Sequence, residues 1–254
     1  MDNSHKSSCP ICQRWFMVLF LKSEAKELAL TVFPVNMKNP EPEFKEYHAT
    51  PPVVVLVQEN VVLTDNLRIE QYICNRFTSL DLTSDKEAEN VCSDVYIVSL
   101  AFNSTKLKRK KTIQFYFNSK KFNAYLKAVD QSVQAKERQL LLELKRINDF
   151  LEQRGTTFLS GNEMTLIDCD VMPKLQHIRV AGKGFKNFEV PNEFKALWRY
   201  MSACYETKAF KESCPYDQDI ILHYEGKVSI KPLGKNPTLQ RASTTMSLPD
   251  DIDQ

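Results

Sequence analysis

No stretch of this sequence reaches the roughly 18 to 20 consecutive apolar residues that a membrane-spanning helix needs. The best candidate runs from Cys9 to Val35, but it contains five charged side chains, among them Arg14 and Lys22. Each such charge is costly at the centre of a bilayer. Residues 1–8 also lack the apolar core of a secretory signal peptide. Hydropathy alone therefore predicts a soluble protein.

The sequence also lacks a large excess of charge of either sign. Its 34 Lys and Arg residues nearly balance 32 Asp and Glu residues, for a net charge of +2, which predicts neither nucleic acid nor a strongly acidic partner. The seven cysteines are odd in number and scattered, which argues against a secreted disulfide framework and favours a reducing cytosol. With 254 residues, 43% of them hydrophobic, the chain suits one large domain or two small ones.

Two cysteines near the start of the chain carry the clearest chemical signal. Cys9 and Cys12 enclose two residues and open an apolar, helix-like segment. A helix N-terminus stabilises the thiolate of the first sulfur, and the second lies near enough to resolve a mixed disulfide. We therefore expect Cys9 as nucleophile and Cys12 as resolving thiol. Structural thiols and half of a zinc site remain alternatives, but no second CxxC or CxxH accompanies the motif, so we expect no metal.

Helix and strand patterns alternate in the first third of the chain. They predict a helix over Gln13–Lys26, strands over Leu28–Val35, Val53–Val57 and Val61–Thr64, and then a helix capped by Asp65. This order after a CxxC motif is that of a thioredoxin-like domain after its first strand.

The first strand of such a domain has no counterpart in the sequence. Residues 1–8 are polar and too few to supply an interior strand. We expect either that the native chain begins upstream of Met1, which we favour, or that another element fills the place.

Past Leu82 the patterns are helical. A helix stripe over Ala135–Arg154 ends at Gly155, Thr165 and Asp168 form a capping box for the next helix, and Pro191 begins a further one. We expect a thioredoxin-like domain over residues 1–80, an all-helical domain over 81–225 and a disordered tail over 226–254.

Groups of residues over most of the chain share the spacing of a known family. They are Cys9-Pro10-x-x-Gln13-Arg14-x-Phe16, Thr64-Asp65-Asn66 with Ile69-Glu70, Gly161 to Cys169, Phe194 to Met201 and Ser213-Cys214-Pro215. The sequence resembles the chloride intracellular channel (CLIC) family, and its second cysteine resembles the invertebrate members. This family is similar in fold to the omega-class glutathione transferases. The resemblance thus implies a thioredoxin-like N-terminal domain followed by an all-helical, glutathione-transferase-like C-terminal domain.

The resemblance implies two activities. Family members are soluble proteins with glutaredoxin-like activity and also associate with membranes, where they are credited with chloride conductance. The implied partners are glutathione or protein thiols, membrane lipids and chloride, and the implied location is the cytoplasm with reversible membrane association. The segment Cys9–Val35 would insert, and its charges require refolding and an oligomer. Two alternatives remain: a thiol-disulfide oxidoreductase without channel function, and a scaffold recruited to membranes.

The family fold also implies a glutathione site, which this sequence alters. Pro52 matches the cis-proline that faces the cysteine, and the residue before it pairs with glutathione through N–H and C=O. Here that residue is Pro51, which has no N–H, so we expect weak glutathione binding. Val53, Asp65 and Asn66 complete the expected site. For Asp65, a simple N-cap is an equally open interpretation.

Residues 97–120 depart from the family pattern. This segment contains the basic run Lys106–Lys111, and removing it would join two halves of one helix. We expect either an insertion or a retained intron. The basic run is typical of a solvated loop, and less often of a nuclear signal or a patch for anionic lipid.

Overall fold

The computed structural model describes residues 6–35, 39–47, 55–57, 61–93, 120–225, 227–228, 231–233, 243–250 and 252. Three residues of the expected glutathione site, Pro51, Pro52 and Val53, lie outside these ranges. The expected insertion also lies outside them, except for its last residue.

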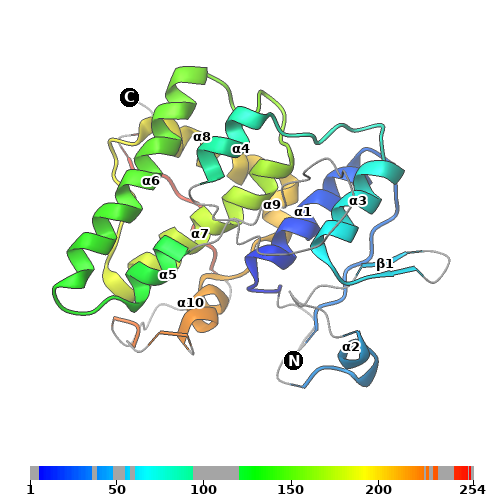
Figure 1. The fold of residues 1–254 in the computed structure, drawn as a ribbon, viewed down its shortest axis with the longest axis horizontal. Coiled ribbons are helices and arrows are strands. Elements are labelled where there is room, and N and C mark those ends of the chain that lie inside the picture. The colour runs from blue at the N-terminus through cyan, green and yellow to red at the C-terminus, as the bar shows by residue number, and fades with distance from the viewer. Residues whose placement is uncertain are drawn as a thin grey trace, which may run out of the picture.

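The described residues of the N-terminal part form three helices and one hairpin. The elements are α1 (Pro10–Glu24), α2 (Pro42–Glu46), β1 (Val55–Val57), β2 (Val61–Leu63) and α3 (Asn66–Arg76). The two strands pair antiparallel, with Val55 opposite Leu63. Helices α1 and α3 lie side by side next to this hairpin, and the indole N–H of Trp15 on α1 donates to Asn66 Oδ1 at the start of α3 (Figure 1).

The strand expected over residues 28–35 is wrong. The structure has no strand in this segment, and the side chains of Val32 and Phe33 are 46% and 79% exposed. A strand forms only when its N–H and C=O groups pair with a neighbouring chain. Within the described ranges no strand lies beside these residues. The apolar and β-branched composition of residues 28–35 therefore favours a strand, but the described structure offers these residues no strand to pair with.

Seven helices follow among the described residues. They are α4 (Lys86–Ser93), α5 (Lys120–Lys127), α6 (Ser132–Arg154), α7 (Leu166–Lys186), α8 (Lys195–Glu206), α9 (Lys208–Ser213) and α10 (Asp217–Glu225). Helix α7 runs through the middle of this group and contacts α1, α4, α5 and α10 (Figure 1). Most of its residues are buried. Since α7 packs against α1, it joins the helical part to the N-terminal part.

Local signals fix the ends of the long helices where the sequence predicted. Gly155 ends α6 with φ 62°, a left-handed conformation that glycine adopts without steric cost. The capping box at the start of α7 is present, because Asp168 accepts from the N–H of Thr165 at 2.8 Å. The same carboxylate accepts from the N–H of Leu159 at 3.0 Å, so it also fixes the loop before α7.

Two other expectations need correction. The helix expected to begin at Pro191 begins at Lys195. Pro191 instead starts a turn, because its carbonyl accepts from Phe194 N and from the indole N–H of Trp198. The disorder expected over 226–254 does not extend to residues 243–250 and 252. Those residues bond to α7 and α10, and Ile252 is 5% exposed. The polar composition of the tail did not reveal these partners.

Replacing Asp168 with alanine is expected to destabilise the protein strongly. The substitution leaves the buried N–H groups of Leu159 and Thr165 without an acceptor, and each such loss costs about 1–3 kcal/mol. Urea unfolding followed by circular dichroism should show a free energy of unfolding lower by at least about 2 kcal/mol. Asp149→Ala is the control, because Asp149 is half exposed, pairs with Lys145 on its own helix and accepts from its neighbour Asn148 at 3.4 Å. Loss of such exposed contacts costs at most about 1 kcal/mol. Equal losses in the two variants would contradict the structural role of Asp168.

Candidate functional site

The two thiols of the CxxC motif lie at the first turn of α1. Cys9 is the N-cap residue and Pro10 the first residue of the helix, a position where proline loses no helical hydrogen bond. The carbonyl of Cys9 accepts from Gln13 N at 3.0 Å. Both Cys9 and Cys12 are partly buried and unbridged. The sequence therefore places Cys9 at the positive end of a helix, as expected for a reactive thiol.

The surroundings of Cys9 favour its thiolate. A hydrogen bond from the Cys12 thiol is the largest cause that lowers the pKa of Cys9, to about 6, and the backbone N–H groups of Cys12 and Ile11 and the charge of Lys227 act in the same direction. Burial opposes them. The pKa of Cys12 is raised, because its proton is held by the Cys9 thiolate and because it is buried. Near neutral pH the pair is therefore a Cys9 thiolate beside a Cys12 thiol.

The other five cysteines have the opposite character. Burial raises the pKa of every one of them: Cys74, Cys92, Cys169, Cys204 and Cys214. Of these only Cys74 is exposed. All seven cysteines lie in the described ranges, so Cys9 is the one thiol of the chain whose pKa is lowered.

Helices α9 and α10 form the neighbouring wall of the site. Gln13 Nε2 on α1 donates to Ser213 Oγ on α9 at 3.3 Å. Beyond α10, Lys227 lies over the ring of Tyr224 at 5.9 Å, and the hydroxyl of Tyr224 lies 3.1 Å from His177 Nδ1 on α7. Burial holds the pKa of His177 well below its ordinary value, so this histidine is neutral. The helical domain thus brings a cation and a tyrosine to the thiols.

An ionic network centred on the buried Arg14 lies two residues beyond Cys12 on α1. Arg14 on α1 bonds to Glu70 on α3 at 2.8 Å and pairs with Asp170 on α7 at 3.6 Å. Asp170 also pairs with Lys174 at 2.8 Å. Burial lowers the pKa of Lys174 to about 8. The network fixes α1, and with it the CxxC motif, against both neighbouring helices.

The described residues of the expected glutathione site have structural contacts. Asp65 accepts from the N–H groups of Leu67 and Arg68 at 3.0 and 3.1 Å. Asp65 is therefore the N-cap of α3. Asn66 accepts from Trp15. Whether Asp65 and Asn66 also contact glutathione stays a prediction.

Sequence reasoning did not identify Lys227 and Tyr224 as neighbours of the thiols. Tyr224 lies in the last turn of α10 and Lys227 lies just after that helix. Both are more than 200 positions from Cys9, and no sequence motif marks them. Only the packing of α10 against α7 reveals them.

Comparison with known proteins identifies the family. Residues 1–79 match the CLIC-like N-terminal domain. The chloride intracellular channel Clic of Drosophila melanogaster is 37% identical over 257 residues, covering 100% of this chain and 88% of that protein. This chain belongs to the chloride intracellular channel family. A second CLIC relative, exc-4 of Caenorhabditis elegans, is 29% identical over 244 residues, covering 95% of this chain and 81% of that protein.

Solved structures confirm the fold of this CLIC protein. The crystal structure of EXC-4 from C. elegans matches with a TM-score of 0.79 and 26% identity, covering 99% of this chain and 91% of that one. Dehydroascorbate reductase from Chlamydomonas reinhardtii matches with a TM-score of 0.67 and 21% identity, over 89% and 93% of the two chains. The expected thioredoxin-like domain followed by a glutathione-transferase-type helical domain is confirmed.

Two further properties concern the described residues alone. None of the helices in these ranges has the length and apolarity needed to cross a bilayer. No three side chains of the metal-ligating kinds come together in the same ranges.

Replacing Cys12 with alanine is expected to raise the pKa of Cys9. The substitution removes the thiol donor, the largest cause of the lowered value, so the pKa should move from about 6 toward the ordinary thiol value of about 8.5. Because only the thiolate is alkylated, the iodoacetamide reaction at Cys9 should reach half its maximal rate at a higher pH. Mass spectrometry of the Cys9 peptide at each pH gives this rate.

Lys227→Met provides a graded comparison for the same measurement. Its charge is a smaller cause of the lowered pKa of Cys9, so the shift should be in the same direction and smaller. Lys208→Met removes an equal charge near Glu24, at the other end of α1, and should leave the profile unchanged. If the Cys12 variant kept the wild-type profile, the thiol pair would not control Cys9.

Proposed function

We propose that this CLIC protein is a redox-active protein that associates reversibly with membranes from the cytoplasm and supports chloride transport there. The observation that carries this proposal is the 37% identity to Drosophila Clic along the whole chain. The lowered pKa of Cys9 at the N-terminus of α1 supports the redox part. The printed names of the two relatives, both chloride intracellular channels, support the transport part.

The redox part follows from the different states of the two thiols. The Cys9 thiolate attacks one sulfur of a mixed disulfide between a protein and glutathione, and the other sulfur leaves as a thiolate that takes a proton from water. The charge on Cys9 is then gone, so Cys12 loses its proton more readily and attacks the Cys9 sulfur. This second exchange releases the bound thiol and leaves a Cys9–Cys12 disulfide. Two glutathione molecules reduce that bond and become oxidised glutathione.

Glutathione is the proposed reductant, bound weakly. The dehydroascorbate reductase shares the fold of this chain. So does a trimeric glutathione transferase from Leishmania, which matches with a TM-score of 0.59 and 15% identity; the match covers 88% of this chain and 48% of that one. The missing N–H of Pro51 removes one hydrogen bond of about 0.5–1.5 kcal/mol. The remaining expected contacts are Pro52, Val53, Asp65 and Asn66.

The membrane part requires the N-terminal segment to refold. In the folded protein Arg14 pairs with Glu70 and Asp170, and Lys22 donates to the carbonyls of Phe77 and Leu80. A segment that leaves for the bilayer loses these partners, and each unpaired charge in lipid is costly. Neighbouring copies in an oligomer are the proposed source of new partners.

Reduction of a glutathione mixed disulfide is expected to fall to the uncatalysed background in Cys9→Ser, because a serine hydroxyl is not a nucleophile for disulfides. A coupled assay of oxidised glutathione production measures this loss. Cys74→Ser is the matched control, since the exposed Cys74 has a raised pKa, and it should keep full activity. Full activity in Cys9→Ser would overturn the redox assignment.

Chloride efflux from loaded liposomes tests the transport part. Wild-type protein should raise the efflux measured with a chloride electrode above that of protein-free liposomes, and flotation of the same liposomes should show bound protein. Efflux at the protein-free level with active thiols would favour the oxidoreductase without channel function. Membrane binding that neither Cys9→Ser nor Cys12→Ser changes, without efflux, would favour the scaffold.

A further inference from the structure

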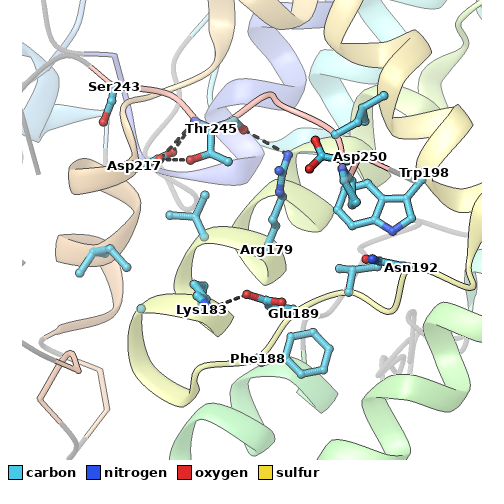
Figure 2. Close-up of a pocket in the computed structure, with 16 residues that line it drawn as sticks. Arg179, Lys183, Phe188, Glu189, Asn192, Trp198, Asp217, Ser243, Thr245 and Asp250 are labelled. Carbon is cyan, nitrogen blue, oxygen red and sulfur yellow. Dashed lines mark hydrogen bonds and ion pairs between the residues drawn. The ribbon is translucent and has the colours of Figure 1, made fainter. Parts of the chain in front are cut away.

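Lys227 follows a helix that is fixed firmly against the rest of the helical domain. Gly184 on α7 lies so close to α10 that a Cβ at this position would clash with Ile221. At the first residue of α10, the carboxylate of Asp217 accepts from Thr245 N at 3.1 Å (Figure 2). Because α10 is held along its length, the packing of the domain also sets the place of the residue that follows it.

The side chain of Lys227 is held by two neighbours although it is exposed. Its Nζ lies 2.6 Å from His223 Nε2 and 5.9 Å from the ring centre of Tyr224. Burial, and then the charge of Lys227, lower the pKa of His223 to about 4, so the imidazole is neutral and accepts from the ammonium group. A side chain that is already ordered loses less entropy when it binds a ligand. Lys227 therefore presents a positioned cation to solvent.

The charges of Lys227 and Cys9 act on each other. Burial lowers the pKa of Lys227, the Cys9 thiolate raises it, and the charge of Lys127 lowers it. The Cys12 thiol lowers the pKa of Cys9 most, and the charge of Lys227 adds to this effect. Lys127, the last residue of α5, is exposed like Lys227. Among the described residues, neither of these two ammonium groups pairs with a carboxylate, so their charge is left for a ligand.

A thiolate by itself disfavours anionic substrates. Like charges repel, so an anionic group beside a disulfide hinders the approach of its sulfur atoms to Cys9, and a cation next to the thiolate reverses this preference. Glutathione carries a net negative charge at neutral pH. Its expected hydrogen bond from the residue before Pro52 is missing, because Pro51 has no N–H. A cation from the helical domain would therefore add binding that the N-terminal domain does not provide.

We propose that Lys227 selects the substrate of the thiol site and favours disulfides that carry an anionic group beside the sulfur atoms, as a glutathione mixed disulfide does. The inference rests on the redox part of the proposed function and names the substrate class of that part. Lys227 takes no part in the bond changes. The Cys9 thiolate forms a bond to one sulfur, the original S–S bond breaks, and the other sulfur leaves as a thiolate that takes a proton from water.

Three symmetric aliphatic disulfides that differ only in their end groups test this selection on the reduced full-length protein. They are dithiodipropionate, which is anionic, hydroxyethyl disulfide, which is neutral, and cystamine, which is cationic. Acid quenching and mass spectrometry of the Cys9 peptide give the rate at which reduced Cys9 disappears. Each rate is divided by that of the neutral disulfide. This ratio does not depend on the pKa of Cys9, because all three disulfides react with the same thiolate.

Lys227→Met should lower the anionic-to-neutral ratio about fivefold, the factor for two unit charges about 4 Å apart in water. The cationic-to-neutral ratio should rise by a similar factor. Lys227→Glu should extend both changes, and Lys227→Arg should keep the wild-type ratios. Lys208→Met is the matched control, because it removes an equal charge near Glu24 at the other end of α1, and it should leave both ratios unchanged.

Salt gives a second test, which needs no variant. In the wild-type protein, added sodium chloride should lower the anionic-to-neutral ratio, because screening weakens the attraction to Lys227. If the thiolate alone met the substrate, screening would weaken a repulsion and the ratio would rise. A ratio that rises or stays constant with salt would overturn the proposal, as would wild-type ratios in Lys227→Met and Lys227→Glu. Failure of the wild-type protein to react with any of the three disulfides would overturn the redox function itself and this inference with it.

Two peptide substrates identify the anionic group. One is a neutral peptide joined by a disulfide to glutathione, and the other is an acidic peptide joined to mercaptoethanol. Relative to hydroxyethyl disulfide, Lys227→Met should slow the reaction of the first about fivefold and leave that of the second nearly unchanged. The reverse result would assign Lys227 to acidic segments of protein substrates and overturn the assignment to glutathione.

Discussion

The buried ion pairs of Arg14 are the interaction on which the arrangement of the site depends. Two charges removed from water need excellent partners, because desolvation alone costs several kcal/mol for each ion. Arg14 finds these partners on two helices, Glu70 on α3 and Asp170 on α7. The cation and the two carboxylates therefore permit one placement of α1. The placement of Cys9 and Cys12, at the first turn of the same helix, follows from it.

The same network stabilises the folded form relative to the proposed membrane form. Arg14 lies in the segment proposed to enter the bilayer, and its departure would leave Asp170 and Lys174 buried in α7 without it. Removing one partner from a buried pair is strongly destabilising. A transition of this protein to the membrane thus has to compensate a loss in both domains, and the apolar contacts of α1 with α7 add to that loss.

Local signals made part of the fold predictable. The ends of α6 and α7 depend on Gly155, Thr165 and Asp168, whose effects reach only a few residues along the chain. The predictions of a strand over residues 28–35 and of a helix start at Pro191 were wrong. Strand pairing and turn geometry depend on residues that lie outside the short stretch of sequence on which each prediction rested. The position of Cys9, the thiol whose pKa is lowered, was predictable from the spacing of the motif, but its neighbour Lys227 was not.

By itself the sequence determined the family and the two domain types and predicted which cysteine is the nucleophile, since short, contiguous motifs carry each of these. The tertiary structure alone decided which charges surround that cysteine and that the polar residues around Thr245 bind α7 and α10. The physical reason is distance along the chain. Thr245 lies 28 residues from Asp217 and 69 from Gln176, and hydrogen bonds between such residues exist only after the helices have packed.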